Sequence, residues 1–462
     1  MAQLDPLQLL LCAIVAAPGA VFFALAFLWL AGWNPGESFL ARLTGAAYSL
    51  LCAAVAALAW AMQAAGQNAV TVKLGTWFTV HRYQFPLVLH ADHLSVPLIG
   101  LTALLTGLIG AFSRRYLHRD RGFHRFFLML HLFGFGSMLI FSAGSFDLIV
   151  GGWELVGITS VVLIAFFYER PDPVRSALRV FATYRACDLG LLWAVFLMHH
   201  SAGSASFDVL FGGAWPAQST LTPQTAAWIA LLLLLAASGK SAQIPFSGWL
   251  PRAMEGPTPS SAIFYGAISI HAGAYVLLRA QPLLAASPAV AALVVMVGLL
   301  SAVHATMVGR ASADAKTSLA YASMAQVGLI FAEIGMGFTQ LALMHILGHA
   351  LTRTLQFLRT PSMLHDYHGV HAAAGGHLEP TGLHYEAIFP ARARLWLYRL
   401  ALDRGHHDAI LDRLVVGPLL QLSAGLTRIE RRLLGPLTEP AAAQHSVTMP
   451  RPAREVAGGK NV

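Results

Sequence analysis

Apolar runs recur along the chain from residue 9 to residue 358, and they constrain the fold more than any other feature. A helix of about 20 apolar residues matches the hydrocarbon thickness of a bilayer. Only 11% of the 462 residues are charged, whereas a soluble domain carries about 25%. The sequence therefore predicts an all-α polytopic membrane protein with about eleven transmembrane helices, at 9–31, 44–65, 92–113, 125–143, 146–168, 178–200, 225–248, 258–280, 288–309, 318–336 and 337–358.

The distribution of basic residues predicts how these helices are oriented. The loop SRRYLHRDRGFHR, after the third run, holds five arginines, whereas the loop at 201–224 has no lysine or arginine. Short basic loops stay in the cytoplasm, so we expect the N-terminus outside the cell (inner) membrane and the C-terminus in the cytoplasm. The first run, Leu9 to Leu30, lacks a basic leader and a small-residue cleavage site. We therefore expect it to be a retained span rather than a signal peptide.

The character of the chain changes after Leu358. Residues 359–390 are polar and rich in histidine, and the stretch that follows has apolar residues at helical spacing interrupted by charges, which is typical of an amphipathic helix on a membrane or a partner. We expect N-terminal transmembrane helices and an outer loop at 1–90, a core at 91–358, a cytoplasmic polar segment with an amphipathic helix at 359–439, and a disordered tail at 440–462. The net charge of +8 is assigned to orientation and anionic lipid rather than to nucleic acid.

Two ionisable residues stand out within the apolar runs. Glu154 lies in the fifth run, and Lys240 follows fourteen residues without a charge in the seventh. Ionisable groups inside a membrane usually face protein or water and mark a pathway. Glu154 has no basic residue near it in sequence, so we expect its partner to be Lys240 from another helix. The segment GKSAQIPFSGW should break the seventh helix beyond Lys240, where a wet discontinuity would let the ammonium gain and lose a proton.

Two further groups allow alternative interpretations. Arg185 and Asp188 are three residues apart on the sixth run, so they can form a purely structural ion pair or tune their neighbours. His345, His349 and Arg353 form a polar stripe at i, i+4 and i+8 on the last run. Two histidines at this spacing could bind a metal, but no carboxylate or cysteine motif completes a site, so we expect a proton relay and no metal.

The chain resembles the antiporter-like membrane subunits of respiratory complex I and of cation/proton antiporters, with the subunit-5 branch of complex I the best match. The resemblance covers residues 90–365 and rests on four segments, GGWELVGITSVVLIAFFY, ASGKSAQIPFSGWLPRAMEGPTPSSA, DAKTSLAYASMAQVGL and MHILGHALTRTLQFL. It implies a fold of two inverted five-helix repeats, each with a broken helix, and proton translocation along an axis of charged residues. Glu154 and Lys240 match the essential glutamate and lysine of that family, Lys316 its bridging lysine, and His345 and His349 its paired histidines.

The chain departs from the family pattern at several of these positions. The usual SALIHAATMVTAG reads SAIFYGAISIHAG, so Tyr265 replaces a histidine and His271 is new. The usual PLHTWLPDAM reads PFSGWLPRAM, with Ser247 and Arg252 in place of a histidine and an aspartate. Arg353 stands where the family usually has lysine. The chain also stops before the later spans, which in complex I carry a further lysine and a long lateral helix.

These departures make the chain more similar to the membrane subunit of two-component inorganic carbon transporters. That resemblance implies a large cytoplasmic zinc-containing partner, similar to β-carbonic anhydrases, and coupling of CO2 or bicarbonate uptake to a proton (cation) gradient. The alternative is a proton-pumping subunit of NADH:quinone oxidoreductase, or of a related hydrogenase or antiporter complex, whose partners are other membrane subunits. A structural scaffold, the third interpretation, predicts that the buried charges are dispensable.

The sequence predicts no cofactor in the chain itself. The three cysteines, Cys12, Cys52 and Cys187, lie in apolar runs without CxxC spacing and are interpreted as small hydrophobic residues. There is also no GxGxxG before a helix and no haem-binding spacing. We therefore expect a transporter subunit with no redox or hydrolytic site of its own.

Overall fold

The computed structural model describes residues 4–80, 83–212, 215–362, 388–406, 409–410 and 412–434. It divides into two units, Met1–Val416 and Gly417–Val462. Most of the expected polar segment at 359–390, and all of the expected tail at 440–462, lie outside the described residues.

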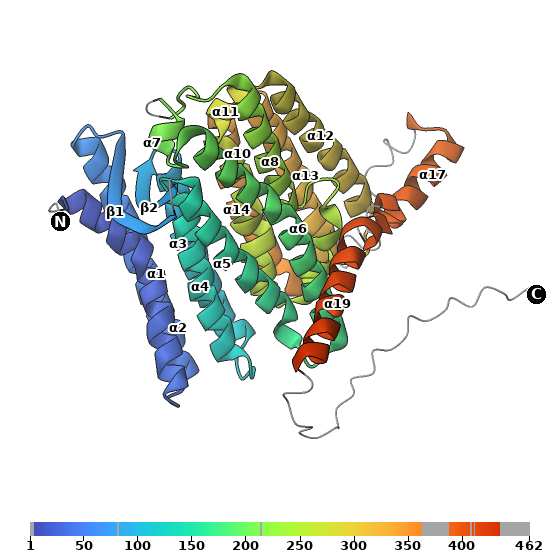
Figure 1. Cartoon of the computed structure of the whole chain (residues 1–462). Helices are drawn as coiled ribbons and strands as arrows, with labels where there is room; N and C mark the ends of the chain where they lie inside the picture. Colours follow the sequence, from blue (N-terminus) through green and yellow to red (C-terminus); the bar gives the residue numbers. More distant parts are fainter. Residues whose placement is uncertain are drawn as a thin grey trace, which may run out of the picture. The chain divides into compact units, whose positions relative to one another are not determined.

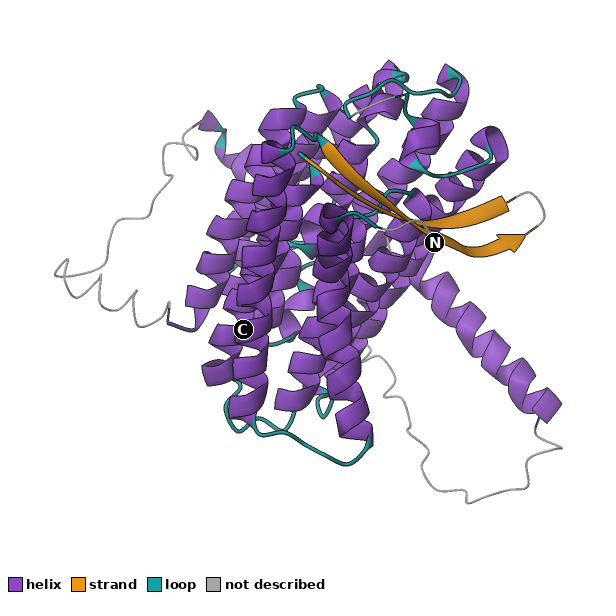
Figure 2. Cartoon of the chain, turned by 90° about the vertical axis from the view of Figure 1, so that its left-hand side faces the viewer, coloured by secondary structure: helices purple, strands orange, loops and turns teal. Residues whose placement is uncertain are grey.

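The first unit consists of helices and one β-hairpin (Figures 1 and 2). Its elements are α1 (Pro6–Leu30), α2 (Glu37–Ala64), β1 (Ala69–Val80), β2 (Tyr83–Asp92), α3 (Ser95–Tyr116), α4 (Phe123–Phe141), α5 (Phe146–Ile164), α6 (Pro171–Ala202), α7 (Phe207–Leu210), α8 (Pro223–Lys240), α9 (Thr258–Ser261), α10 (Ser269–Arg279), α11 (Gln281–Ala285), α12 (Pro288–Ala311), α13 (Ala315–Gly335), α14 (Thr339–Arg359) and α17 (Ala391–Leu402).

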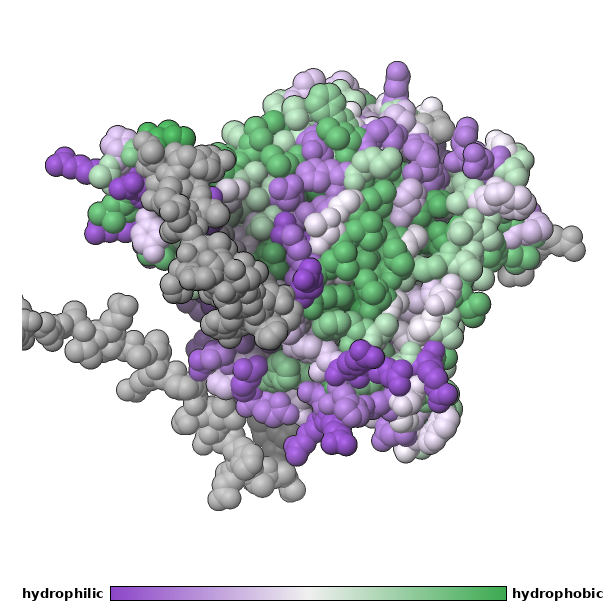
Figure 3. Space-filling view, turned by 180° about the vertical axis from the view of Figure 1, so that it is seen from behind, coloured by the Kyte–Doolittle hydropathy of each residue, from purple (hydrophilic) through white to green (hydrophobic). Residues whose placement is uncertain are grey.

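Nine helices in the described part of the chain are long and apolar enough to cross a membrane. They are α1 to α6, the continuous helical stretch Thr258–Arg279, α12 and α13. Each of the eleven runs expected from the sequence overlaps a helix, but the exact number of spans and the inverted repeats stay predictions. Hydrophobic side chains cover the middle of the face seen in Figure 3, and hydrophilic ones gather toward its two ends. The chain is a multi-pass membrane protein.

The hairpin occupies residues that the sequence analysis assigned to an outer loop. Strand β1 pairs with β2 in antiparallel register, from Ala69 opposite Asp92 to Val80 opposite Tyr83. Val70 and Val72 are buried and alternate with exposed residues, which is the pattern of a half-buried strand. The hairpin lies at the end of the bundle where α3 begins, and the loop between α3 and α4, with Arg119 and Arg121, lies at the other (Figure 1). We call these the hairpin end and the arginine-loop end.

The helix that carries Lys240 ends at that residue, as its Gly- and Pro-rich continuation predicts. After α8 the backbone runs through short 3₁₀ turns at Ser247–Trp249 and Arg252–Glu255 before α9 begins. The next helix contains a π-helical segment, Ala262–Ala267, and such segments often accompany functional sites. Two consecutive spans are therefore irregular near the expected site.

Small residues let several helices pack closely. Gly190 on α6 faces the backbone of α8, Gly273 on α10 faces Ala237 on α8, and Gly298 and Gly328 bring α12 and α13 together. Small residues serve this purpose in membrane proteins because lipid supplies no hydrophobic drive for helix association.

The second unit contains one described helix, α19 (Gly417–Leu434). Its exposed apolar residues Leu422, Leu426, Ile429 and Leu433 follow helical spacing. This confirms the expected C-terminal amphipathic helix, while its place on a membrane or a partner stays a prediction.

Candidate functional site

The nine expected site residues fall into two clusters and one separate position. The first cluster joins α5, α6 and the end of α8, and contains Glu154, Arg185, Asp188 and Lys240. The second joins α10, α13 and α14, and contains His271, His345 and His349, with Arg353 one turn further along α14. Lys316 stands apart at the start of α13.

Arg185 is the centre of the first cluster. One of its terminal nitrogens lies 2.6 Å from the Glu154 carboxylate on α5, and the other lies 2.7 Å from the Asp188 carboxylate one turn along α6. The expected pair of Arg185 and Asp188 is therefore present, but the ion-pair partner of Glu154 is Arg185 and not Lys240. Arg185 was not considered for Glu154 because it lies far from it in sequence, whereas its forked guanidinium has five donors and binds both carboxylates at once.

Lys240 lies beside this ion network. Its Nζ donates a hydrogen bond to the backbone carbonyl of Trp153 at 3.0 Å, and it sits over the rings of Trp153 and Tyr184, at 4.8 and 4.9 Å from their centroids. The indole nitrogen of Trp153 donates to Asp188 at 2.5 Å. Trp153 thus connects the buried ammonium to the carboxylate network, and aromatic faces stabilise the cation where water is scarce.

Burial increases through the cluster from Glu154 to Lys240. The side chains of Glu154 and Arg185 are 37% and 34% exposed, that of Asp188 is 6% exposed, and Lys240 is 1% exposed. Two carboxylates, one guanidinium and one ammonium together carry no net charge. Glu154 is therefore the most exposed member of the cluster, and Lys240 is the most deeply buried.

Lys316 holds the backbone at the break after α8. Its Nζ donates to the carbonyls of Met254 and Gly256, at 2.7 and 2.9 Å. Carbonyls released by a broken helix need such partners inside a membrane. The structure therefore gives Lys316 a position at the break, and its expected part in proton transfer stays a proposal.

His271 and His349 contact each other directly. His271 Nδ1 faces the carbonyl oxygen of Ala267, which can only accept, so this nitrogen carries the hydrogen. His271 Nε2 lies 2.9 Å from His349 Nδ1, and one of these two nitrogens donates to the other. His349 Nε2 is buried with no hydrogen-bond partner among the described residues.

His345 is placed differently from the other two histidines. Its Nδ1 lies 2.8 Å from the Glu333 carboxylate, and its Nε2 lies 3.0 Å from the amide oxygen of Gln326. His345 therefore lies between a carboxylate on one ring nitrogen and an amide on the other. His345 and His349 lie edge to face with ring centroids 6.4 Å apart.

Aromatic and hydroxyl groups occupy the space between the clusters. Trp249 packs edge-on against Tyr184 of the first cluster and against Tyr265 of the π-helical segment. The Tyr265 hydroxyl lies 2.8 Å from that of Ser160 on α5. Tyr265, one of the departures from the family pattern, thus lies between the two clusters.

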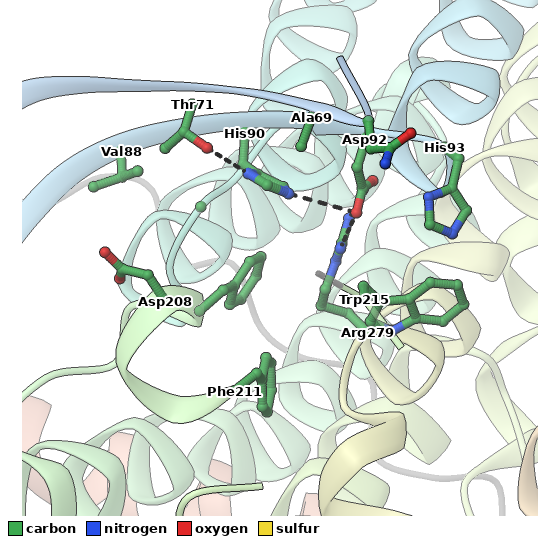
Figure 4. Close-up of a pocket in the computed structure, with 13 residues that line it drawn as sticks. Ala69, Thr71, Val88, His90, Asp92, His93, Asp208, Phe211, Trp215 and Arg279 are labelled. Carbon is green, nitrogen blue, oxygen red and sulfur yellow. Dashed lines mark hydrogen bonds and ion pairs between the residues drawn. The ribbon is translucent and has the colours of Figure 1, made fainter. Parts of the chain in front are cut away.

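A third polar group lies in a cavity of about 400 Å³ at the hairpin end (Figure 4). Arg279 at the end of α10 forms a two-pronged ion pair with Asp92 at 2.7 and 3.0 Å, and it also donates to Tyr275. His90 lies between Asp92 and Thr71. Burial alone would raise the pKa of the Asp92 carboxyl, but the charge of Arg279 and the contacts with His90 and Arg279 outweigh burial and hold this pKa below its usual range.

Several residues of these sites were missed from the sequence, among them Asp92, Arg279, Glu333 and Gln326. Asp92, Arg279 and Glu333 lie near the ends of their apolar runs, where a charge is ordinary. Gln326 is neutral and was not counted among the ionisable groups. A signal was present for Arg279, because His271, Tyr275 and Arg279 follow one another at i, i+4 and i+8.

Comparison with known families and proteins gives consistent matches. The family described as "NADH:quinone oxidoreductase/Mrp antiporter, TM" matches residues 143–375, which is half of the chain, and the family described as "NADH-Ubiquinone oxidoreductase (complex I), chain 5 N-terminus" matches residues 77–127. NADH-ubiquinone oxidoreductase chain 5 of Schizophyllum commune is 33% identical over 65% of this chain and 43% of its own. NADH-quinone oxidoreductase subunit L of Mycobacterium tuberculosis is 33% identical over 70% of this chain and 52% of its own.

A solved structure gives the same result for the fold. A chain in the structure of the Mrp complex from Dietzia sp. DQ12-45-1b matches with a TM-score of 0.63 and 27% identity, over 76% of this chain and 37% of that one. The chain spans about half the length of the curated relatives it matches.

Proposed function

This chain belongs to the family of NADH:quinone oxidoreductase and Mrp antiporter membrane subunits, and from this membership and its buried charges we propose that it conducts protons across the membrane. The observation that carries the proposal is the shared guanidinium of Arg185. It binds Glu154, which is partly exposed, and Asp188, which contacts Lys240 through Trp153. A change of charge on Glu154 therefore alters the electrostatic stabilisation of the Lys240 ammonium.

Proton arrival on Glu154 starts the proposed step. The proton cancels the charge of Glu154 and leaves Arg185 to Asp188 alone. Asp188 is then more fully neutralised, so Lys240 loses electrostatic support and gives its proton to a neighbouring water. Departure of the proton from Glu154 reverses each change.

The second cluster takes the proton onward. His349 Nε2 is buried and has no hydrogen-bond partner in the part of the chain that the structure describes, and His345 Nδ1 lies 2.8 Å from Glu333. Histidine suits this role because it gains and loses a proton near neutral pH. Lys316 acts as the bridging ammonium at the break, and His271 and Arg353 tune the histidines from either side.

The test uses the tagged chain, purified with its bound partners and reconstituted in vesicles that report internal pH. We expect Glu154→Gln and Lys240→Ala to lower proton flux by at least about tenfold. Glu169→Gln, an exposed change in the turn between α5 and α6, is the matched control. Undiminished flux in the correctly inserted Glu154→Gln and Lys240→Ala variants would show that these residues do not conduct.

We further propose that this conduction drives inorganic carbon uptake through a cytoplasmic zinc-containing partner similar to β-carbonic anhydrases. The support is the sequence resemblance around Tyr265 and His271. In this proposal the hairpin end faces outward and the arginine-loop end faces the cytoplasm of a cell with an inner membrane. Affinity purification should yield one large zinc protein. Loss of that protein should abolish growth that relies on uptake of CO2 or bicarbonate.

A second candidate function is supported by the names of the relatives, which are subunits of NADH oxidoreductases and of an Mrp complex. In that case the same residues would conduct protons next to other membrane subunits. Recovery of several small hydrophobic proteins with the tagged chain, and no zinc protein, would favour this function.

A further inference from the structure

A groove lies on the first unit between α12, α13 and α14, and one of its lining residues touches His345. The groove has a volume of about 250 Å³, and it is lined by Thr306 and Arg310 of α12, Ser318, Ala322 and Gln326 of α13, and Arg353 of α14. Gln326 also bonds His345 Nε2 at 3.0 Å. Gln326 therefore lies between the groove and this nitrogen of His345, whose side chain is 21% exposed.

From this geometry we propose that the groove is a hydrated route between the arginine-loop end and His345, with Gln326 as its gate. The inference rests on the proposed function, because it names the path by which the second cluster exchanges protons with water. Nothing in the proton step at Glu154 and Lys240 requires this route.

The lining residues form a row that runs from the arginine-loop end toward His345. Ser318, Ala322 and Gln326 lie on one face of α13 at i, i+4 and i+8, and eight residues of helix span about 12 Å. Ser318 is in the first turn of α13, near Arg310 in the last turn of α12. The stripe therefore leads from the arginine-loop end to the depth of His345.

Small side chains leave the groove open. Ala322 and Gly309 line its walls, where a larger residue would fill it. A volume of about 250 Å³ holds on the order of eight water molecules at about 30 Å³ each. Ser318, Thr306 and Gln326 supply polar groups that such waters need.

Charged side chains lie at both ends of the route. Arg310 and Arg353 line the groove, and Glu333 lies 2.8 Å from His345 Nδ1. A proton that reaches His345 Nε2 is therefore balanced by a carboxylate on the other side of the ring.

Gln326 is a positioning residue, because an amide does not titrate. In the structure its oxygen occupies His345 Nε2. When the amide turns into the groove, a water takes its place on Nε2. A hydronium then gives its proton to a free Nε2 and becomes water, or a protonated ring gives Nε2–H to water and becomes neutral.

Cysteine accessibility tests the route without reference to transport. Ser318→Cys and Ala322→Cys are treated in vesicles with a charged thiol reagent and, separately, with an apolar maleimide, and labelled peptides are identified by mass so that the native cysteines do not interfere. We expect both positions to react with the charged reagent. Val327→Cys, buried on another face of α13, is the matched control and should not react.

Two outcomes would overturn the route. Ala322→Cys may be as unreactive as Val327→Cys, which means a closed groove, or it may react only with the maleimide, which means a groove filled by lipid. Both outcomes are independent of flux through Glu154 and Lys240, so they are distinct from failure of the proposed function.

Two substitutions test the gate. Gln326→Leu fills the space with an apolar side chain, and we expect proton flux to fall by at least about tenfold. Gln326→Ala leaves room for water at His345 Nε2, and we expect its flux to exceed that of Gln326→Leu by at least about threefold. Equal loss in both variants would show that Gln326 only supports the structure and is not a gate.

Discussion

Arg185 shows how much depends on the shape of one side chain. Its two terminal nitrogens bind carboxylates on two helices at 2.6 and 2.7 Å. A lysine would keep the charge, but its single ammonium lacks the fork that binds both groups. We expect Arg185→Lys to lower proton flux by about tenfold while the protein remains folded.

The measurement is pH-reported flux in vesicles with circular dichroism as the folding check. Arg175→Lys, on the same helix, is the control, because Arg175 is exposed and pairs with Asp172 only at 3.6 Å. Equal flux in the two variants would mean that charge alone, and not the shared fork, links Glu154 to Asp188.

Glu333 supports the second cluster in a comparable way. Its carboxylate lies 2.8 Å from His345 Nδ1, where it stabilises a proton that the ring takes up. Glu333→Gln keeps the size and polarity of the side chain but removes this charge, so we expect proton flux at neutral pH to fall by about tenfold or more. Vesicle flux with Glu169→Gln as the matched control gives the comparison, and normal flux in Glu333→Gln would show that proton transfer through His345 does not need this carboxylate.

The sequence alone was sufficient to identify site residues whose type is rare within an apolar run. Glu154, Lys240 and His349 stand out because an apolar run seldom contains an ionisable group, and all three lie in the clusters. Partners were harder to predict because pairing between helices depends on rotation and depth, which spacing along one helix does not contain. For that reason Arg185 was predicted in a pair with Asp188 but not with Glu154.

At the scale of helices and strands, apolar length and helix-breaking residues predicted most of the fold. The helix α8 ends at Lys240, where the Gly- and Pro-rich segment begins. The hairpin was not predicted, because half of it is exposed and its alternation is weak. The π-helical segment Ala262–Ala267 has no comparable sequence signal, since its sequence is typical of any apolar helix.

The break after α8 depends on Lys316. Its ammonium satisfies the carbonyls of Met254 and Gly256. Lys316→Met removes both hydrogen bonds and leaves acceptors without partners, which costs about 1–3 kcal/mol for a buried group. We expect a lower Tm for the purified protein in detergent, whereas Lys73→Met on the exposed hairpin should change it little; an unchanged Tm in Lys316→Met would mean that water replaces the ammonium.

Close packing of α12 and α13 gives a second test at this scale. A Cβ atom at Gly328 would lie 2.5 Å from the carbonyl oxygen of Gly298, so the two helices must separate to accept it. We expect Gly328→Ala to lower the Tm and to disturb the neighbouring groove. Gly348→Ala on α14 is the matched control, since nothing lies within 4 Å of its added methyl group and alanine favours a helix by about 0.5–1 kcal/mol. A Tm that falls equally in both variants would argue against specific packing at Gly328.

At the scale of the first unit, the polar groups extend from the membrane interior to the hairpin end. Two clusters lie among the helices, and the Asp92–Arg279 pair ties the hairpin to α10. Asp92 also accepts hydrogen bonds from the backbone of Leu94 and Ser95 at the start of α3. One carboxylate therefore joins a strand and two helices.

This arrangement makes the stability of the hairpin end depend on pH. The pKa of Asp92 is lowered in the folded protein, so its contribution to the free energy of unfolding is present above its unfolded pKa of about 4 and is lost as the pH falls below that value. Asp92→Asn removes the charge and leaves Arg279 buried without its partner, which should cost about 3–5 kcal/mol at neutral pH. The difference in Tm between the unmodified protein and Asp92→Asn should therefore shrink as the pH is lowered from 7 toward 3.

Asp208→Asn, at a half-exposed ion pair with Lys73, should show a small difference in Tm from the unmodified protein at every pH. A gap between the unmodified protein and Asp92→Asn that stays constant over this range would mean that packing of the side chain, and not its ionised carboxylate, attaches the hairpin to the helices.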